Sequence, residues 1–77
     1  MLLDVETRAG AHGDPEPTAF SMGARRIAVS AVLDRWLAPE YGYFKVQADD
    51  GALYILRHDL PRDEWELTLF KAPGVAP

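Results

Sequence analysis

The sequence predicts an all-β fold, a small antiparallel meander closed into an SH3-like barrel of about five or six strands. Apolar residues recur at every second position, most clearly from Tyr43 to Phe70, and this period is that of half-buried strands. Turn sequences interrupt the alternation at short intervals, as hairpin connections do. Because a flat meander would expose two long edges, closure into a barrel is the favoured arrangement.

The C-terminal third carries the clearest alternation. Asp50-Gly51 predicts a tight hairpin turn, because Asp-Gly accepts the positive φ angles that such turns need. Pro61 stiffens the next turn, so three strands are expected between residues 43 and 70. The side chains expected to face the core are Phe44, Val46, Leu53, Ile55, Trp65, Leu67 and Leu69.

The segment from Arg25 to Leu37 admits two interpretations. Its β-branched residues, such as Ile27 and Val29, favour a long, bent strand. Its apolar residues also fall at helical spacing, so the alternative is an open sheet with a short helix near residues 31–37. The strand is preferred because no capping box begins a helix here. We interpret Trp36 as a core residue in this segment.

Composition divides the chain of 77 residues into three parts. Residues 1–18 form an acidic, Pro- and Gly-containing leader with at most one edge strand. Residues 19–71 form a single small β-domain, and residues 72–77, rich in Pro, Gly and Ala, form a flexible tail. Two prolines between residues 9 and 18 remove backbone donors, so no regular element is expected there. His12 is interpreted as a solvated loop side chain rather than a metal ligand.

Charge and cysteine content narrow the function classes. The net charge is −4, and residues 1–17 hold four of the twelve acids but one of the eight bases. An electrostatic nucleic-acid binder carries a clear basic excess, which this chain lacks. The absence of cysteine excludes disulfides and a cysteine nucleophile, and it favours a cytoplasmic location. No apolar run is long enough to span a membrane, so no membrane partner is expected.

Arg57-His58-Asp59 is the strongest candidate for catalytic chemistry, since it sets a base, an imidazole and a carboxylate side by side. Neighbouring strand residues point to opposite faces, so His58 would need a carboxylate from another strand. We therefore interpret the run as the polar rim of a hairpin. The acids near the turns lack the spacing of a calcium loop. No enzymatic activity, metal ligand or cofactor is expected.

Basic and aromatic side chains supply the candidate binding site. Tyr43 and Lys45 share one face of a predicted strand, and such pairs can stack on bases and contact phosphates. The expected function is nevertheless a non-catalytic module for protein–protein interaction, through an exposed strand edge or an aromatic groove. The alternative is a nucleic-acid-binding barrel. The candidate residues are Arg25, Arg26, Tyr41, Tyr43, Lys45, Tyr54 and Arg57.

Five short motifs follow one another between residues 19 and 70. They are Gly23 with Arg25-Arg26, Trp36, Phe44-Lys45-Val46, Asp50-Gly51-x-x-Tyr54, and Trp65-x-Leu67. As a set they resemble the signature of a group of small uncharacterised bacterial all-β domains, a domain of unknown function. The resemblance implies a stand-alone all-β domain. It assigns no role to any residue, because the group has no assigned activity.

Overall fold

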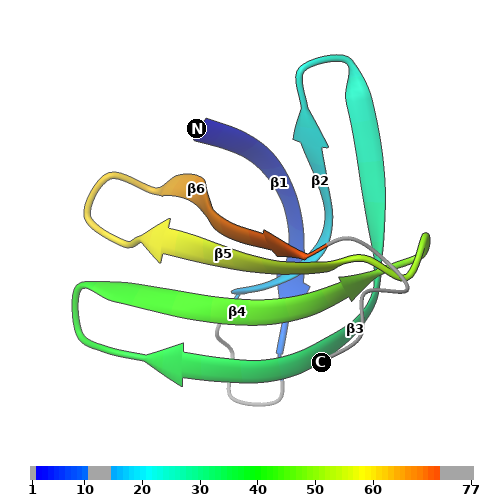
Figure 1. Cartoon of the computed structure of the whole chain (residues 1–77). Helices are drawn as coiled ribbons and strands as arrows, with labels where there is room; N and C mark the ends of the chain where they lie inside the picture. The colour runs from blue at the N-terminus through cyan, green and yellow to red at the C-terminus, as the bar shows by residue number, and fades with distance from the viewer. Residues whose placement is uncertain (1, 11–14, 72–77) are drawn as a thin grey trace.

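The protein is a closed six-stranded barrel in the computed structural model, which describes residues 2–10 and 15–71. Every strand pairs antiparallel with the next, and the last strand returns to the first (Figure 1). The prediction of a small antiparallel all-β barrel of about five or six strands is confirmed. The strands are β1 (Leu2–Ala9), β2 (Pro15–Met22), β3 (Arg25–Leu37), β4 (Tyr41–Ala48), β5 (Leu53–Asp59) and β6 (Glu64–Lys71).

The segment with two interpretations is one strand of 13 residues, and the alternative helix at residues 31–37 is wrong. β3 pairs with β4 as far as Leu37 opposite Gly42, with bulges between Val29 and Ala31 and again before Asp34. A bulge places an extra residue on one strand and shifts the side chains that follow to the other face. The first shift turns both Val29 and Val32 toward the core, and this spacing of three residues imitates a helix.

The part of the predicted leader that the structure describes belongs to the barrel. β1 pairs with β2 along most of its length, and β2 begins at Pro15, so the expectation that residues 9–18 contain no regular element is wrong. The domain boundary placed at residue 18 falls inside β2. Both prolines are tolerated because β3 pairs only with Ala19–Met22, so neither removes a β2–β3 hydrogen bond. His12 and the predicted tail lie outside the described residues.

The core forms where the even-numbered residues of β4 and β5 face the inside of the barrel. Phe44 and Val46 are buried as predicted. Leu56 lies directly opposite Phe44 and Tyr54 opposite Val46. Cross-strand partners share a face, so the even residues of β5 are the buried ones. The prediction that Leu53 and Ile55 face the core is therefore wrong. Further core residues are Leu3, Phe20, Ile27, Ala48, Ala52 and Trp65.

Two other core predictions are wrong for reasons of register. Leu69 is 50% exposed because the β5–β6 register shifts between Ile55 and Leu56, which turns Leu69 outward. Trp36 is 49% exposed because it lies opposite Tyr43, on the outer face of the sheet. Trp65, in contrast, is buried, and Leu67 packs against the core as predicted.

Candidate functional site

Three strands bring aromatic and cationic side chains together on the outside of the barrel. Trp36 of β3 lies directly opposite Tyr43 of β4, which in turn lies opposite Arg57 of β5. Direct cross-strand partners share a face, so these residues form a row across the sheet. Tyr41 lies two residues from Tyr43, on the same face of β4. We call Trp36, Tyr41, Tyr43 and Arg57 the aromatic–arginine face.

Contacts among Tyr41, Tyr43 and Arg57 hold these three side chains in place. The rings of Tyr41 and Tyr43 meet edge to face, with centroids 5.6 Å apart. The guanidinium carbon of Arg57 lies 5.0 Å from the centroid of the Tyr41 ring, in cation–π geometry. Arg57 Nη1 is also 3.9 Å from Asp59 Oδ2. Arg57 is therefore oriented by a ring and a carboxylate, while its fork of five N–H donors can serve further acceptors.

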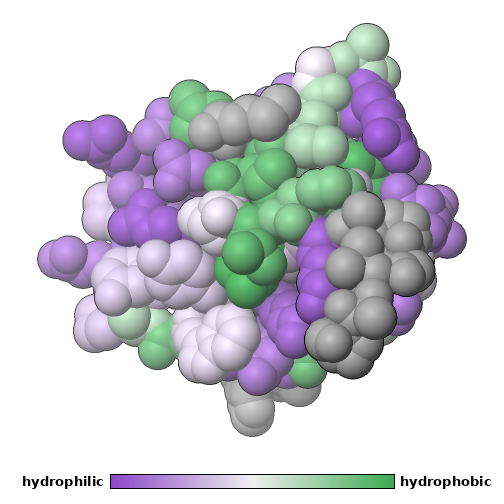
Figure 2. Space-filling model, in the orientation of Figure 1, coloured by the Kyte–Doolittle hydropathy of each residue, from purple (hydrophilic) through white to green (hydrophobic). Residues whose placement is uncertain are grey.

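The aromatic–arginine face is accessible to another molecule. Trp36 is 49% and Tyr41 38% exposed. The apolar surface continues beside it, because Ile55 and the half-exposed Leu69 lie opposite each other on β5 and β6. Figure 2 shows hydrophobic residues gathered near the middle of this side, over β5 and β6. Aromatic and aliphatic side chains that remain accessible together on one surface indicate a contact region.

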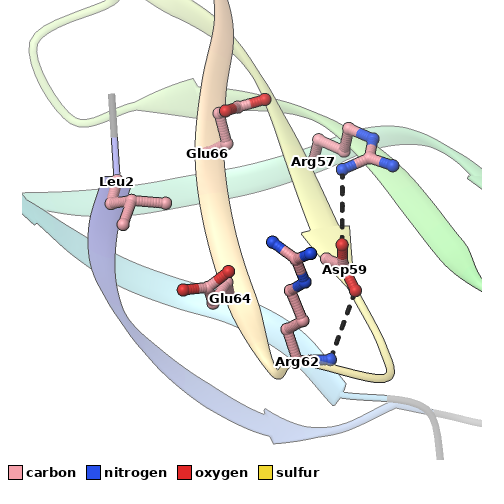
Figure 3. A pocket seen from close by; sticks show the side chains of 6 residues that line it. All are labelled: Leu2, Arg57, Asp59, Arg62, Glu64 and Glu66. Carbon is pink, nitrogen blue, oxygen red and sulfur yellow. Dashed lines mark hydrogen bonds and ion pairs between the residues drawn. The ribbon is translucent and has the colours of Figure 1, made fainter.

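A charged pocket borders the aromatic–arginine face on its β6 side. Figure 3 shows the Arg57 side chain and the backbone N–H of Arg62 directed toward Asp59, with two glutamates of β6 beside them. The backbone N–H of Arg62 donates to Asp59 Oδ1 over 3.2 Å. Because Arg57 belongs to both the pocket and the face, the two are continuous. The hollow measures about 330 Å³ and is lined by Leu2, Arg57, Asp59, Arg62, Glu64 and Glu66.

The structure brings some of the predicted binding residues together and separates others. Tyr41, Tyr43 and Arg57 are in the aromatic–arginine face, and Lys45 follows Tyr43 along the same side of β4. Tyr54 lies inside the barrel, 1% exposed, with its ring 4.9 Å from that of Phe20. A surface role for Tyr54 is therefore excluded.

Arg25 and Arg26 lie at the start of β3, and each forms an ion pair there. Arg25 Nη2 is 3.2 Å from Asp50 Oδ2, and Arg26 Nε is 2.7 Å from Glu6 Oε2. The hydrogen bond from Arg26 lowers the pKa of Glu6 and raises the pKa of Arg26. Neighbouring carboxylates thus largely compensate the positive charges of Arg25 and Arg26.

The Arg57-His58-Asp59 run divides between the two faces of β5. Arg57 and Asp59 lie on the outer face, whereas His58 is buried, so its interpretation as a rim residue is wrong. The His58 ring stacks on Trp65 with centroids 4.1 Å apart. His58 Nε2 is 2.8 Å from Oδ1 of Asp63, in the β5–β6 turn. Asp63 has a φ of 50°, in the left-handed region that aspartate tolerates better than most residues.

No family model, curated protein or solved structure matches this chain. Within residues 2–10 and 15–71, no helix is long and apolar enough to cross a membrane. Function is therefore inferred from the side chains and their contacts.

Proposed function

We propose that the protein is a non-catalytic interaction module that binds a partner protein through the aromatic–arginine face. The row formed by Trp36, Tyr43 and Arg57 across three strands supports this proposal. Trp, Tyr and Arg are the residue types that contribute most binding energy at protein interfaces. These residues stand on paired strands, and Tyr41 contacts both Tyr43 and Arg57. Little freedom of these side chains is therefore lost when a partner binds.

Protein is favoured over nucleic acid as the partner because the candidate cations already have acidic neighbours. Arg25, Arg26 and Arg57 each form an ion pair with a carboxylate. The pocket beside Arg57 adds two glutamates, whose charge opposes phosphate. Lys45 lies opposite Asp34 in the β3–β4 register. Electrostatic binding of a nucleic-acid backbone needs an excess of cations, which this surface does not offer.

Affinity capture with matched variants tests the proposal. Proteins retained from a cell extract by the wild type are purified and titrated against Tyr41→Ser/Tyr43→Ser, which removes both rings from the face. The affinity of a true partner should fall at least about tenfold. The control is Arg25→Ala/Arg26→Ala, which alters exposed residues away from the face and should bind as the wild type does.

Two outcomes would contradict the proposal. The first is a purified partner that binds the tyrosine double variant as tightly as the wild type. The second is salt-sensitive binding of labelled single-stranded RNA or DNA that depends on the same tyrosines, which would favour the nucleic-acid alternative.

A further inference from the structure

The second half of β3 pairs with a neighbour on one side only. β4 covers one edge of residues 29–37, whereas β2 pairs with β3 only through Arg25–Ala28. Continuing the β2–β3 register would set Pro17 opposite Ser30 and Pro15 opposite Val32, and proline has no N–H to donate. Among the described residues, no strand pairs with the other edge of this segment.

The hydrogen-bond alternation of an antiparallel pair shows which backbone groups face this edge. Ala38 N–H donates to the carbonyl of Tyr41 over 2.8 Å. Hydrogen-bonded positions recur at every second residue of an antiparallel strand, so the backbone groups of residues 34 and 36 also bond to β4. Arg35 and Leu37 then point their N–H and C=O groups away from β4. In agreement, the Arg35 N–H donates to Asp34 Oδ1 at 2.8 Å rather than to a β4 carbonyl.

The end of β3 is open on both of its faces. All residues from Leu33 to Leu37 are exposed, although successive strand residues point in opposite directions. Leu33 is 49% and Leu37 53% exposed. An unpaired edge with accessible backbone groups is complementary to another extended chain, which supplies the missing donors and acceptors.

We propose that a second copy of this chain occupies the edge, with its β3 antiparallel and a two-fold axis at Trp36. In this register Arg35 of each copy lies opposite Leu37 of the other. Each such pair exchanges two hydrogen bonds once the Arg35 N–H gives up its bond to Asp34 Oδ1, so four bonds cross the interface. The half-exposed rings of the two Trp36 residues meet at the axis.

Neighbouring two-fold registers are less favourable for this sequence. An axis at Asp34 or at Arg35 would set like charges directly opposite each other, which destabilises a strand pair. An axis at Leu37 would place Arg35 opposite Pro39, which lacks an N–H. The register at Trp36 avoids both faults. It also joins the aromatic–arginine faces of the two copies into one surface, although the pairing does not depend on that surface binding a partner.

Analytical ultracentrifugation over a range of concentrations tests the pairing. The wild type should show a weak, concentration-dependent monomer–dimer equilibrium, because the interface is small. Arg35→Pro removes an edge-facing N–H without breaking the β4 ladder, and edge strands accept proline. With two donors lost per dimer, the association should weaken roughly 10- to 100-fold. Arg35→Ala removes the same side chain, including its ion pair with Glu16, but keeps the N–H, so it should associate as the wild type does.

Hydrogen exchange in the wild type provides a second measurement that needs no folded proline variant. The Leu37 amide should exchange more slowly as the protein concentration rises, while the amide of Ala24, in the β2–β3 turn, should not change. A wild type that stays monomeric at every concentration, with Leu37 exchange unaltered, would overturn the proposal. So would an Arg35→Ala variant that dissociates as readily as Arg35→Pro. Protection of Leu37 only after a foreign peptide is added would assign the edge to that peptide instead.

Discussion

Tyr54 is among the largest fully buried side chains, and its burial has a consequence at high pH. Burial raises the pKa of Tyr54 above 10.0, Asp50 acts in the same direction, and Arg25 opposes both. A group whose pKa is raised in the folded state contributes stability below its unfolded pKa. That contribution is lost as the pH rises through the folded pKa. We therefore expect the free energy of unfolding to fall above about pH 10.

The Tyr54→Phe variant isolates this effect. It has no phenol to ionise inside the barrel, so its stability should fall less than that of the wild type between about pH 8 and about pH 11. Urea denaturation across this range measures the difference. Tyr41→Phe, at an exposed tyrosine, is the control and should follow the wild type. Equal losses in Tyr54→Phe and the wild type would contradict the assignment.

The two tryptophans provide a matched pair for the energetics of the core. Trp65 is 5% exposed and packs on His58 and Phe44, whereas Trp36 is 49% exposed. Trp65→Ala should lower the free energy of unfolding by about 3–5 kcal/mol, because it removes a buried ring and leaves a cavity. Trp36→Ala should change it by less than about 1 kcal/mol. Urea denaturation compares the two, and similar losses would refute these placements.

At the scale of the strand, the sequence predicts which face is buried when apolar and polar residues alternate regularly, so that one face is apolar and the other polar. β4 meets both conditions, so Phe44 and Val46 were predictable as core, and Tyr43 and Lys45 as outward residues. β5 alternates but is apolar on both faces. The choice of its inward face then depends on register with β4, which sets Leu56 against Phe44 and which a single strand does not encode.

The other differences have separate causes. The two bulges of β3 each reverse side-chain parity, so after both of them Trp36 lies on the outward side that alternation from Ile27 and Val29 already indicates. The prediction that Trp36 lies in the core followed from its large apolar ring and not from alternation. β2 carries two prolines, yet it is a strand because its β3 neighbour pairs only beyond them.

Of the candidate site, Tyr41 and Tyr43 were predictable because the regular alternation of β4 puts them on outward positions. The outward position of Arg57 was not predictable from alternation, because Arg57 shares a face of β5 with Leu53 and Ile55, which were expected inside. The burial of Tyr54 was not predictable, because Leu53 and Ile55 on either side of it make both faces of β5 apolar.

For the whole molecule, closure depends on β1. Leu2 lies opposite Glu66 and Leu3 opposite Trp65, and among the residues that the structure describes these two positions alone pair β1 with β6. Deleting residues 2–9 would remove the buried Leu3 and leave β2 and β6 with unpaired edges. We expect the truncated chain to lose cooperative thermal unfolding, as measured by circular dichroism. Leu2→Ala, at a residue that is 65% exposed, should unfold as the wild type does. A truncated chain with an unchanged melting temperature would show that β1 is dispensable.

The pairing of β1 with β6 also determines when the barrel can close during synthesis. Hairpins from β2 to β6 join strands that are near in sequence, whereas Leu3 and Trp65 are 62 residues apart. Contacts between distant residues form late, because the loop between them must first be ordered. At roughly 5–20 residues per second, a ribosome makes Trp65 about 3–12 s after Leu3. During that interval β1 can pair only with β2. The sheet of the nascent chain therefore stays open until β6 has been synthesised.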